Sequence, residues 1–301
     1  MRFLRAACCS VILLMTGVSS RACADERAAP LNPDVRILPA LLASDGIRTH
    51  LVRSPFQPGE TKLRVLLPKL KTPQERVPVL YLLPVEPADQ THYGDPLAEI
   101  LRLKLHERYH IVCVAPTFAQ MPWYADHPRD PLIRQESYFL RVVVPGIERE
   151  YPVRKNSAGR WLIGFSKGGW GAVSLLLRHP DTFDRAAAWD VPYTLPHPDR
   201  YQMSDIFGTQ ENFDRYRIPL LVASQADQFR RETRLVLLGY NLFQDHQREL
   251  HRQLDSLKIP HLHRDGPRRE HRWDSGWLPE AISLLAELPP REAPDRKPRV
   301  P

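Results

Sequence analysis

Cysteine is scarce in this chain of 301 residues, and three of its four cysteines lie within residues 1–24. Only Cys113 follows them, inside an apolar run that we expect to be a buried strand. A single cysteine cannot form an intramolecular disulfide, and no Cys/His spacing of the kind that binds a metal is present. The sequence therefore excludes a disulfide framework and predicts no metal site.

The chain also lacks a run of roughly 20 apolar residues, the length that a membrane-spanning helix needs. Its N-terminal apolar stretch, residues 6–18, is shorter; it follows two arginines and precedes the small-x-small site Ala22-Cys23-Ala24. This pattern is typical of a secretory signal peptide cut after Ala24. We therefore expect residues 1–24 to be removed and the protein to be exported, to the periplasm or the medium. A membrane anchor fits less well because the stretch is short, and a lipid on Cys23 fits less well because no leucine stands three residues before it.

A concentrated charge of one sign is missing too. The net charge of +7 falls to about +4 without the leader, which holds three arginines and no acid. These charges are spread over loops and the tail, so we expect no nucleic-acid partner. Residues 289–301 are rich in proline and charge, and we predict that they are disordered. Residues 25–288 then form one domain, whose oligomeric state the sequence leaves open.

Short apolar runs recur along the chain and alternate with longer amphipathic segments. The expected strands are residues 79–83, 111–115, 161–164, 186–189, 235–238 and 259–264. The expected helices are residues 97–108, 132–151 with a kink at Pro145, 167–178, 220–230, 246–257 and 278–288. Fully apolar strands alternating with helices predict an α/β fold, with a mostly parallel central sheet and helices on both faces. An antiparallel hairpin, residues 49–52 and 63–67 around Pro58-Gly59-Glu60, precedes them.

One segment indicates chemistry: Gly164-Phe165-Ser166-Lys167-Gly168-Gly169-Trp170-Gly171-Ala172. It holds Gly-x-Ser-x-Gly between an expected strand and an expected helix, which is the context of a nucleophile elbow. A chance match in a loop would lack that context. The glycines permit a sharp turn, and the helix N-terminus favours a developing anion. We therefore predict that Ser166 is a nucleophile.

This segment and residues 175–183 resemble the esterase D / feruloyl-esterase family of α/β-hydrolases, which includes the mycolyltransferase antigens. Ala115-Pro116, Trp123-Tyr124-Ala125-Asp126 and residues 138–153 resemble other stretches of that family. The likeness covers roughly residues 49–288 and is most specific around Ser166. It implies the α/β-hydrolase fold and carbohydrate-linked or small acyl esters as substrates.

A serine nucleophile needs a base and an acid that orients the base. In this fold both follow the serine, acid first. His271 follows the last expected strand, so we predict that it is the base. Asp245, after the strand at residues 235–238, is the preferred acid. Asp227 and Asp190 remain open as alternative acids. Asp190 is included because the acid can follow the neighbouring strand, residues 186–189, instead.

An oxyanion hole needs two backbone N–H donors. We assign one to Lys167 and the other to Val85 or Glu86. The family usually has a glycine in this second loop, where this chain reads Pro84-Val85-Glu86. Lys167 in place of methionine is a further departure, and it either lies on the surface or favours an acidic substrate.

We therefore expect hydrolysis of acyl esters, small or carbohydrate-linked, without a cofactor. The candidate substrate-binding residues are Trp123, Tyr124, Trp170 and Trp277. Two other functions remain open. One is acyl transfer to a sugar hydroxyl, as in the mycolyltransferase branch. The other is a catalytically silent fold that binds a ligand or partner, which the altered oxyanion loop favours.

Overall fold

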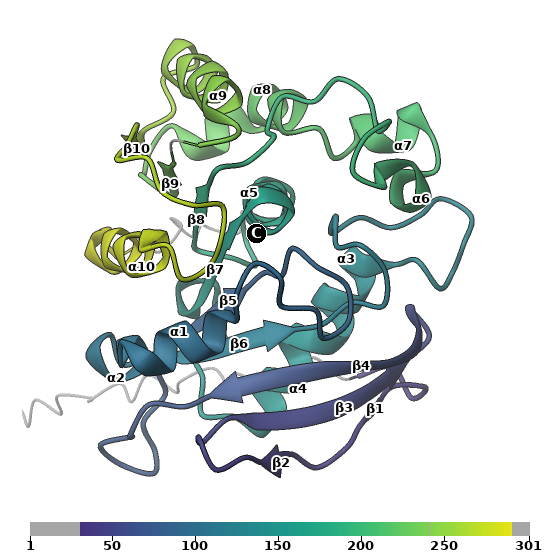
Figure 1. Ribbon diagram of the computed structural model, residues 1–301, viewed down its shortest axis with the longest axis vertical. Coiled ribbons are helices and arrows are strands. Elements are labelled where there is room, and N and C mark those ends of the chain that lie inside the picture. The colour runs from purple at the N-terminus through teal and green to yellow at the C-terminus, as the bar shows by residue number, and fades with distance from the viewer. Residues whose placement is uncertain (1–30, 240, 291–301) are drawn as a thin grey trace, which may run out of the picture.

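The computed structural model describes residues 31–239 and 241–290, so the expected signal peptide and most of the expected tail lie outside the described residues. Ten strands form one sheet in the order β1-β3-β4-β6-β5-β7-β8-β9-β10, and β2 pairs with β3 beside this path (Figure 1). The strands are β1 (Arg36–Ile37), β2 (Leu41–Leu42), β3 (Arg48–Ser54), β4 (Gln57–Leu66), β5 (Val79–Leu82), β6 (Val112–Pro116), β7 (Arg160–Phe165), β8 (Arg185–Trp189), β9 (Leu235–Leu238) and β10 (His261–Arg264).

The parallel part of the sheet runs from β6 to β10, and the antiparallel part runs from β1 to β4. This confirms a mostly parallel α/β sheet. The expected hairpin is present as β3 and β4, but its turn is at Pro55-Phe56, because Ser54 pairs with Gln57. Pro58-Gly59-Glu60 instead lies within β4, where Gly59 adopts a φ of 70°. Pro58 and Gly59 therefore lie in an irregular first part of β4 and not in the hairpin turn.

Helices cover both faces of the sheet. They are α1 (Pro96–Arg102), α2 (Leu105–Arg108), α3 (Gln135–Tyr138), the π-helical η1 (Phe139–Val143), α4 (Val144–Glu150), the 3₁₀ turn η2 (Ser157–Gly159), α5 (Ser166–Arg178), α6 (Met203–Phe207), α7 (Gln210–Asp214), α8 (Ile218–Phe229), α9 (Gln244–Ser256) and α10 (Trp277–Glu287). Residues of α1, α2 and α10 share one apolar cluster, and residues of α3 to α9 share the other. Successive β5 residues alternate between the two clusters, as a strand buried on both faces requires.

Two expected helices are interrupted. Asp95 caps α1 by accepting hydrogen bonds from the amides of Leu97 (3.0 Å) and Ala98 (3.5 Å), and the left-handed Lys104 (φ 52°) separates α1 from α2. Pro145 lies just after the π-helical turn η1. Such a turn accommodates a proline, because the proline has no amide to donate back along the helix.

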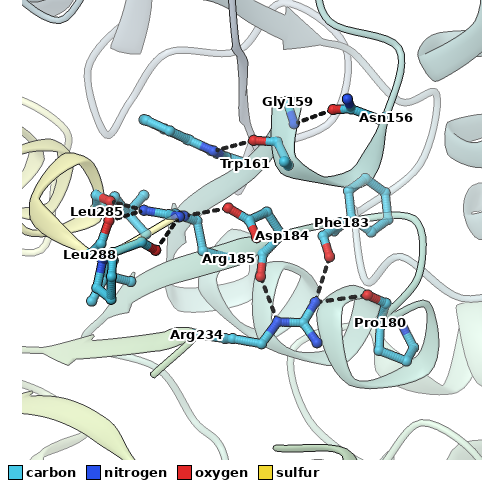
Figure 2. A network of polar contacts seen from close by, with 12 residues as sticks. Asn156, Gly159, Trp161, Pro180, Phe183, Asp184, Arg185, Arg234, Leu285 and Leu288 are labelled. Atoms are coloured by element: carbon cyan, nitrogen blue, oxygen red, sulfur yellow. Dashed lines mark hydrogen bonds and ion pairs between the residues drawn. The ribbon is translucent and has the colours of Figure 1, made fainter. Parts of the chain in front are cut away.

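Two buried arginines tie elements together at the amino ends of the parallel strands (Figure 2). Arg185 begins β8 and donates to the carbonyls of Leu285 (2.7 Å) and Leu288 (2.8 Å) at the end of α10. Arg234, just before β9, donates to the carbonyls of Asp184 and Phe183, both at 2.6 Å. These contacts satisfy carbonyls that a helix end or loop would otherwise leave unpaired. They hold the edge of the sheet opposite the site described below.

Within the described residues, no helix has the length and apolar character needed to cross a bilayer.

Candidate active site

Ser166 lies at a sharp turn between β7 and α5. Its φ of 47° is in the left-handed region, and the side chain is largely buried, with the residue 6% exposed. The turn tolerates no side chain at Gly164 or Gly168. A Cβ at Gly164 would lie 2.4 Å from the carbonyl carbon of Gly168, and a Cβ at Gly168 would lie 2.0 Å from the carbonyl oxygen of Leu83. The strand, the turn and the helix expected around Ser166 are therefore all present, with the strain that a nucleophile elbow carries.

His271 lies beside this turn. Its ring packs edge-on against Phe165, the residue before Ser166, with 4.9 Å between ring centroids. Its Nδ1 lies 2.6 Å from Oδ2 of Asp190. The other carboxylate oxygen of Asp190 accepts a hydrogen bond of 2.8 Å from the amide of Phe243. Because Asp190 accepts a hydrogen bond from Nδ1, which therefore carries the proton, Nε2 of His271 keeps the lone pair that a general base needs.

Asp190 reaches this position through the register of the sheet. Phe165 on β7 pairs with Trp189 on β8, so the residues that follow them, Ser166 and Asp190, emerge next to each other. The Ser166 amide also donates to the Asp190 carbonyl at 3.2 Å. Carboxyl ends of neighbouring parallel strands meet at one edge of a sheet, which is where ligands bind in this class of fold. Asp190 is 2% exposed, so its two hydrogen bonds hold a buried carboxylate.

The preference for Asp245 as the acid is not supported by this geometry. Asp245 is exposed in the first turn of α9 and lines a cavity with His251 and His263. The loop after β9 contributes the Phe243 amide to Asp190 in place of an acid. Asp227 lies on α8 with its side chain 90% exposed and pairs with Arg230. The helix expected over residues 220–230 is confirmed as α8, Ile218–Phe229.

The expected oxyanion loop, Pro84-Val85-Glu86, is held against the elbow. The Tyr124 hydroxyl donates to the Pro84 carbonyl at 2.6 Å. The largely buried Glu86 carboxylate accepts hydrogen bonds from His92 Nδ1 (2.6 Å) and from the amides of His92 (3.1 Å) and Tyr93 (3.3 Å). These contacts fix the loop from which we expect the second oxyanion donor.

Lys167 follows the serine in the first turn of α5, where a backbone amide has no acceptor within its own helix. Its side chain is partly buried. Burial lowers the pKa of Lys167, and the nearby Glu86 carboxylate opposes that shift. The loop approaches the first turn of α5 closely, because a Cβ at Gly168 would lie 2.0 Å from the Leu83 carbonyl oxygen and 3.2 Å from that of Pro84.

The four aromatic residues expected to bind substrate are core residues instead. Trp123, Tyr124 and Trp170 are 0–1% exposed and belong to the cluster under α3 to α9. Trp277 is 0% exposed and belongs to the opposite cluster. Large aromatic side chains contribute strongly to core packing, and a sequence alone does not distinguish that role from pocket lining.

A cavity of about 330 Å³ lies next to the Glu86 loop. Its wall includes Val85, Glu86, Thr117 and Trp273, together with charged side chains from β4. Those charges are paired across the cavity wall: Lys62 with Asp89 at 2.5 Å and Arg64 with Asp95 at 2.7 Å. The cavity therefore has both charged and apolar walls, and two of its lining residues, Val85 and Glu86, are the candidates for the second oxyanion donor.

The comparisons with known proteins agree with this geometry. Residues 54–237 match the family described as "Putative esterase". The chain belongs to this esterase family. Among curated protein sequences, no match was found.

Several solved structures share the fold of this esterase-family chain. An S-formylglutathione hydrolase from Agrobacterium tumefaciens has a TM-score of 0.66 and 17% identity, over 84% of this chain and 99% of its own. A ferulic acid esterase has a TM-score of 0.61 and 20% identity, over 85% and 98%. MPT51 from Mycobacterium tuberculosis has a TM-score of 0.59 and 14% identity, over 88% and 100%. The α/β-hydrolase fold and the resemblance to the family are thereby confirmed.

Proposed function

We propose that this protein is an exported serine esterase that uses Ser166, His271 and Asp190. The observation that carries the proposal is the 2.6 Å contact of His271 with a buried aspartate, beside a strained serine at a helix N-terminus. A catalytic triad is recognised by the geometry of its nucleophile, base and orienting acid, and not by the positions of these residues in the sequence. The leader sequence supports the export part of the proposal.

The reaction follows from these positions. Ser166 Oγ attacks the ester carbonyl carbon while its proton passes to Nε2 of His271. The carbonyl oxygen becomes an anion that the amides of Lys167 and of Val85 or Glu86 stabilise. The bond to the alcohol then breaks, and His271 returns the proton to the leaving oxygen. Water attacks the acyl-enzyme by the same route, releases the acid and restores Ser166.

We further propose small or carbohydrate-linked acyl esters as substrates. Two features support this choice. One is the cavity beside the Glu86 loop, whose wall carries charged side chains, and the other is the fold shared with structures described as a ferulic acid esterase and an S-formylglutathione hydrolase. The four aromatic side chains expected to bind sugar or aromatic groups are buried in the core, so they add no support to this choice.

Hydrolysis of p-nitrophenyl acetate tests the proposal. Ser166→Ala is expected to lower kcat by about 10⁶-fold, since loss of a triad serine has cost that much in a protease. Ser174→Ala, on the same helix and buried, is the matched control and should retain activity. A wild-type protein without activity on this ester and on feruloylated or acetylated sugars would contradict the esterase proposal, as would a fully active Ser166→Ala.

A further inference from the structure

A cluster of histidine and carboxylate groups lies outside the proposed active site, where α9 packs beside β10. His251 and Asp255 are four residues apart on α9 and therefore share one face of the helix. His261 begins β10 and faces them. One ligand atom from each of the three residues lies within 4.8 Å of the other two.

We propose that His251, Asp255 and His261 bind one divalent transition-metal ion of the zinc class. The three ligand atoms lie within 4.8 Å of one another. An ion would use a single nitrogen of His251. Its Nδ1 lies 2.8 Å from His261 Nε2, whereas its Nε2 lies 3.5 Å from an Asp255 carboxylate oxygen. The other Asp255 oxygen lies 4.0 Å from His261 Nε2. Ligands about 2.0 Å from a tetrahedral zinc ion are ~3.3 Å apart, so side-chain rotations that bring the three atoms up to about 1.5 Å closer would complete the geometry.

The hydrogen bonds of His261 direct its lone pair toward the cluster. Its Nδ1 lies 2.8 Å from the Ile259 carbonyl, which can only accept, so Nδ1 carries the proton and Nε2 keeps the lone pair that a ligand needs. Metal-binding histidines are commonly oriented in this way by a backbone carbonyl. The His261 side chain is 3% exposed, whereas that of Asp255 is 62% exposed and free to adjust. The site thus has one fixed ligand and one adaptable ligand.

A positive charge between His251 and Asp255 suits this arrangement. If His251 donates from Nδ1 to His261, its Nε2 faces the Asp255 carboxylate at 3.5 Å, and either a proton on Nε2 or a bound cation satisfies that contact.

A third imidazole supports the same position. His263 stacks on His251 with 4.0 Å between ring centroids and an interplanar angle of 15°, which fixes the His251 ring. Its buried Nε2 makes no hydrogen bond within residues 31–239 and 241–290, so it is free to accept one from a metal-bound water. A cavity of about 560 Å³ lined by His251 and His263 gives the ion a path of entry.

The ion would fasten α9 to β10 and would not take part in the ester chemistry. His261 is the first residue of β10, and the loop that carries His271 begins after the last, roughly 10 Å further along the strand. The sequence predicts no metal because the ligands combine a helical i,i+4 pair with a strand, a spacing unlike Cys/His zinc motifs. The inference is independent of the esterase proposal, so Ser166→Ala should bind the ion as the wild type does.

Isothermal titration with Zn²⁺ tests the inference, using the chelator-treated full chain without a polyhistidine tag. We expect one ion per chain, and we expect at least about tenfold weaker binding in His251→Gln and in Asp255→Asn. His110→Gln, which removes an isolated histidine–glutamate pair (2.9 Å to Glu75), is the matched control and should bind as the wild type does.

Thermal unfolding gives a second readout. Saturating Zn²⁺ should raise the Tm of the wild type and of His110→Gln, and it should leave the Tm of the two cluster variants unchanged. No stoichiometric binding by the wild type would overturn the inference. Undiminished binding in both cluster variants would also overturn it.

Discussion

Replacing Asp190 by asparagine tests the proposed triad through both carboxylate oxygens. Oδ1 accepts the Phe243 amide at 2.8 Å, and Oδ2 accepts His271 Nδ1 at 2.6 Å. An asparagine that keeps its oxygen toward Phe243 presents an NH₂ group to Nδ1. His271 must then carry its proton on Nε2, where it cannot accept the serine proton. The opposite rotamer sets the NH₂ group against the Phe243 amide and leaves a buried donor unpaired, which costs about 1–3 kcal/mol.

The wrong tautomer of a triad histidine lowers kcat by about 10⁴-fold, or ~5.4 kcal/mol at 1.36 kcal/mol per factor of ten. We expect Asp190→Asn to lose activity by that order in p-nitrophenyl acetate hydrolysis, with circular dichroism showing an intact fold. Asp245→Asn makes the same change at an exposed acid, and it should stay within about twofold of wild type because surface changes are nearly neutral. An active Asp190→Asn beside an inactive Asp245→Asn would refute the reasoning.

Three further predictions concern the supports of the site and fold. Glu86→Ala removes the acceptor for three donors and should lower kcat by about 10²-fold through the oxyanion loop; unchanged kinetics would contradict this role. Arg185→Met leaves Asp184 buried and unpaired and should cost about 3–5 kcal/mol in urea unfolding; a cost near zero would contradict it. Burial raises the pKa of Glu136, but hydrogen bonds and charge from its basic neighbours lower it overall. Because the pKa of Glu136 is depressed in the folded state, its contribution to stability is present above the unfolded pKa and is lost as pH falls through the folded pKa. Glu136→Gln should therefore weaken the fall in the free energy of unfolding at acidic pH. An unchanged dependence of that free energy on acidic pH would contradict this.

The sequence predicts most of what positions Ser166. Continuous apolar runs identify the buried parallel strands, and glycines around Ser166 identify the turn, because each pattern reflects a local steric or solvation requirement. Strands β5 to β10 and helices α5, α8, α9 and α10 lie where these patterns indicate, within about two residues.

The acid depends on information that the linear pattern does not carry. Asp190 follows β8 as directly as Ser166 follows β7, which is a signal in the sequence. This position favours Asp190 over the other acids only once β7 and β8 are known to be neighbouring strands with Phe165 paired to Trp189. Asp245 satisfies the order of the fold equally well, but the turn into α9 carries it to an exposed position. The prediction that four aromatic residues bind substrate failed for a related reason, because a large aromatic side chain is equally typical of a buried core and of a pocket wall.

The central claim is that Ser166 is an activated nucleophile, and covalent labelling tests it most directly. The protein is treated with a fluorophosphonate probe, and the modified residue is located by mass spectrometry of the digested chain. The account predicts one adduct, on Ser166, which is absent in Ser166→Ala and strongly slowed in Asp190→Asn. A wild-type chain that forms no adduct, or one whose labelling persists in Ser166→Ala, would contradict it.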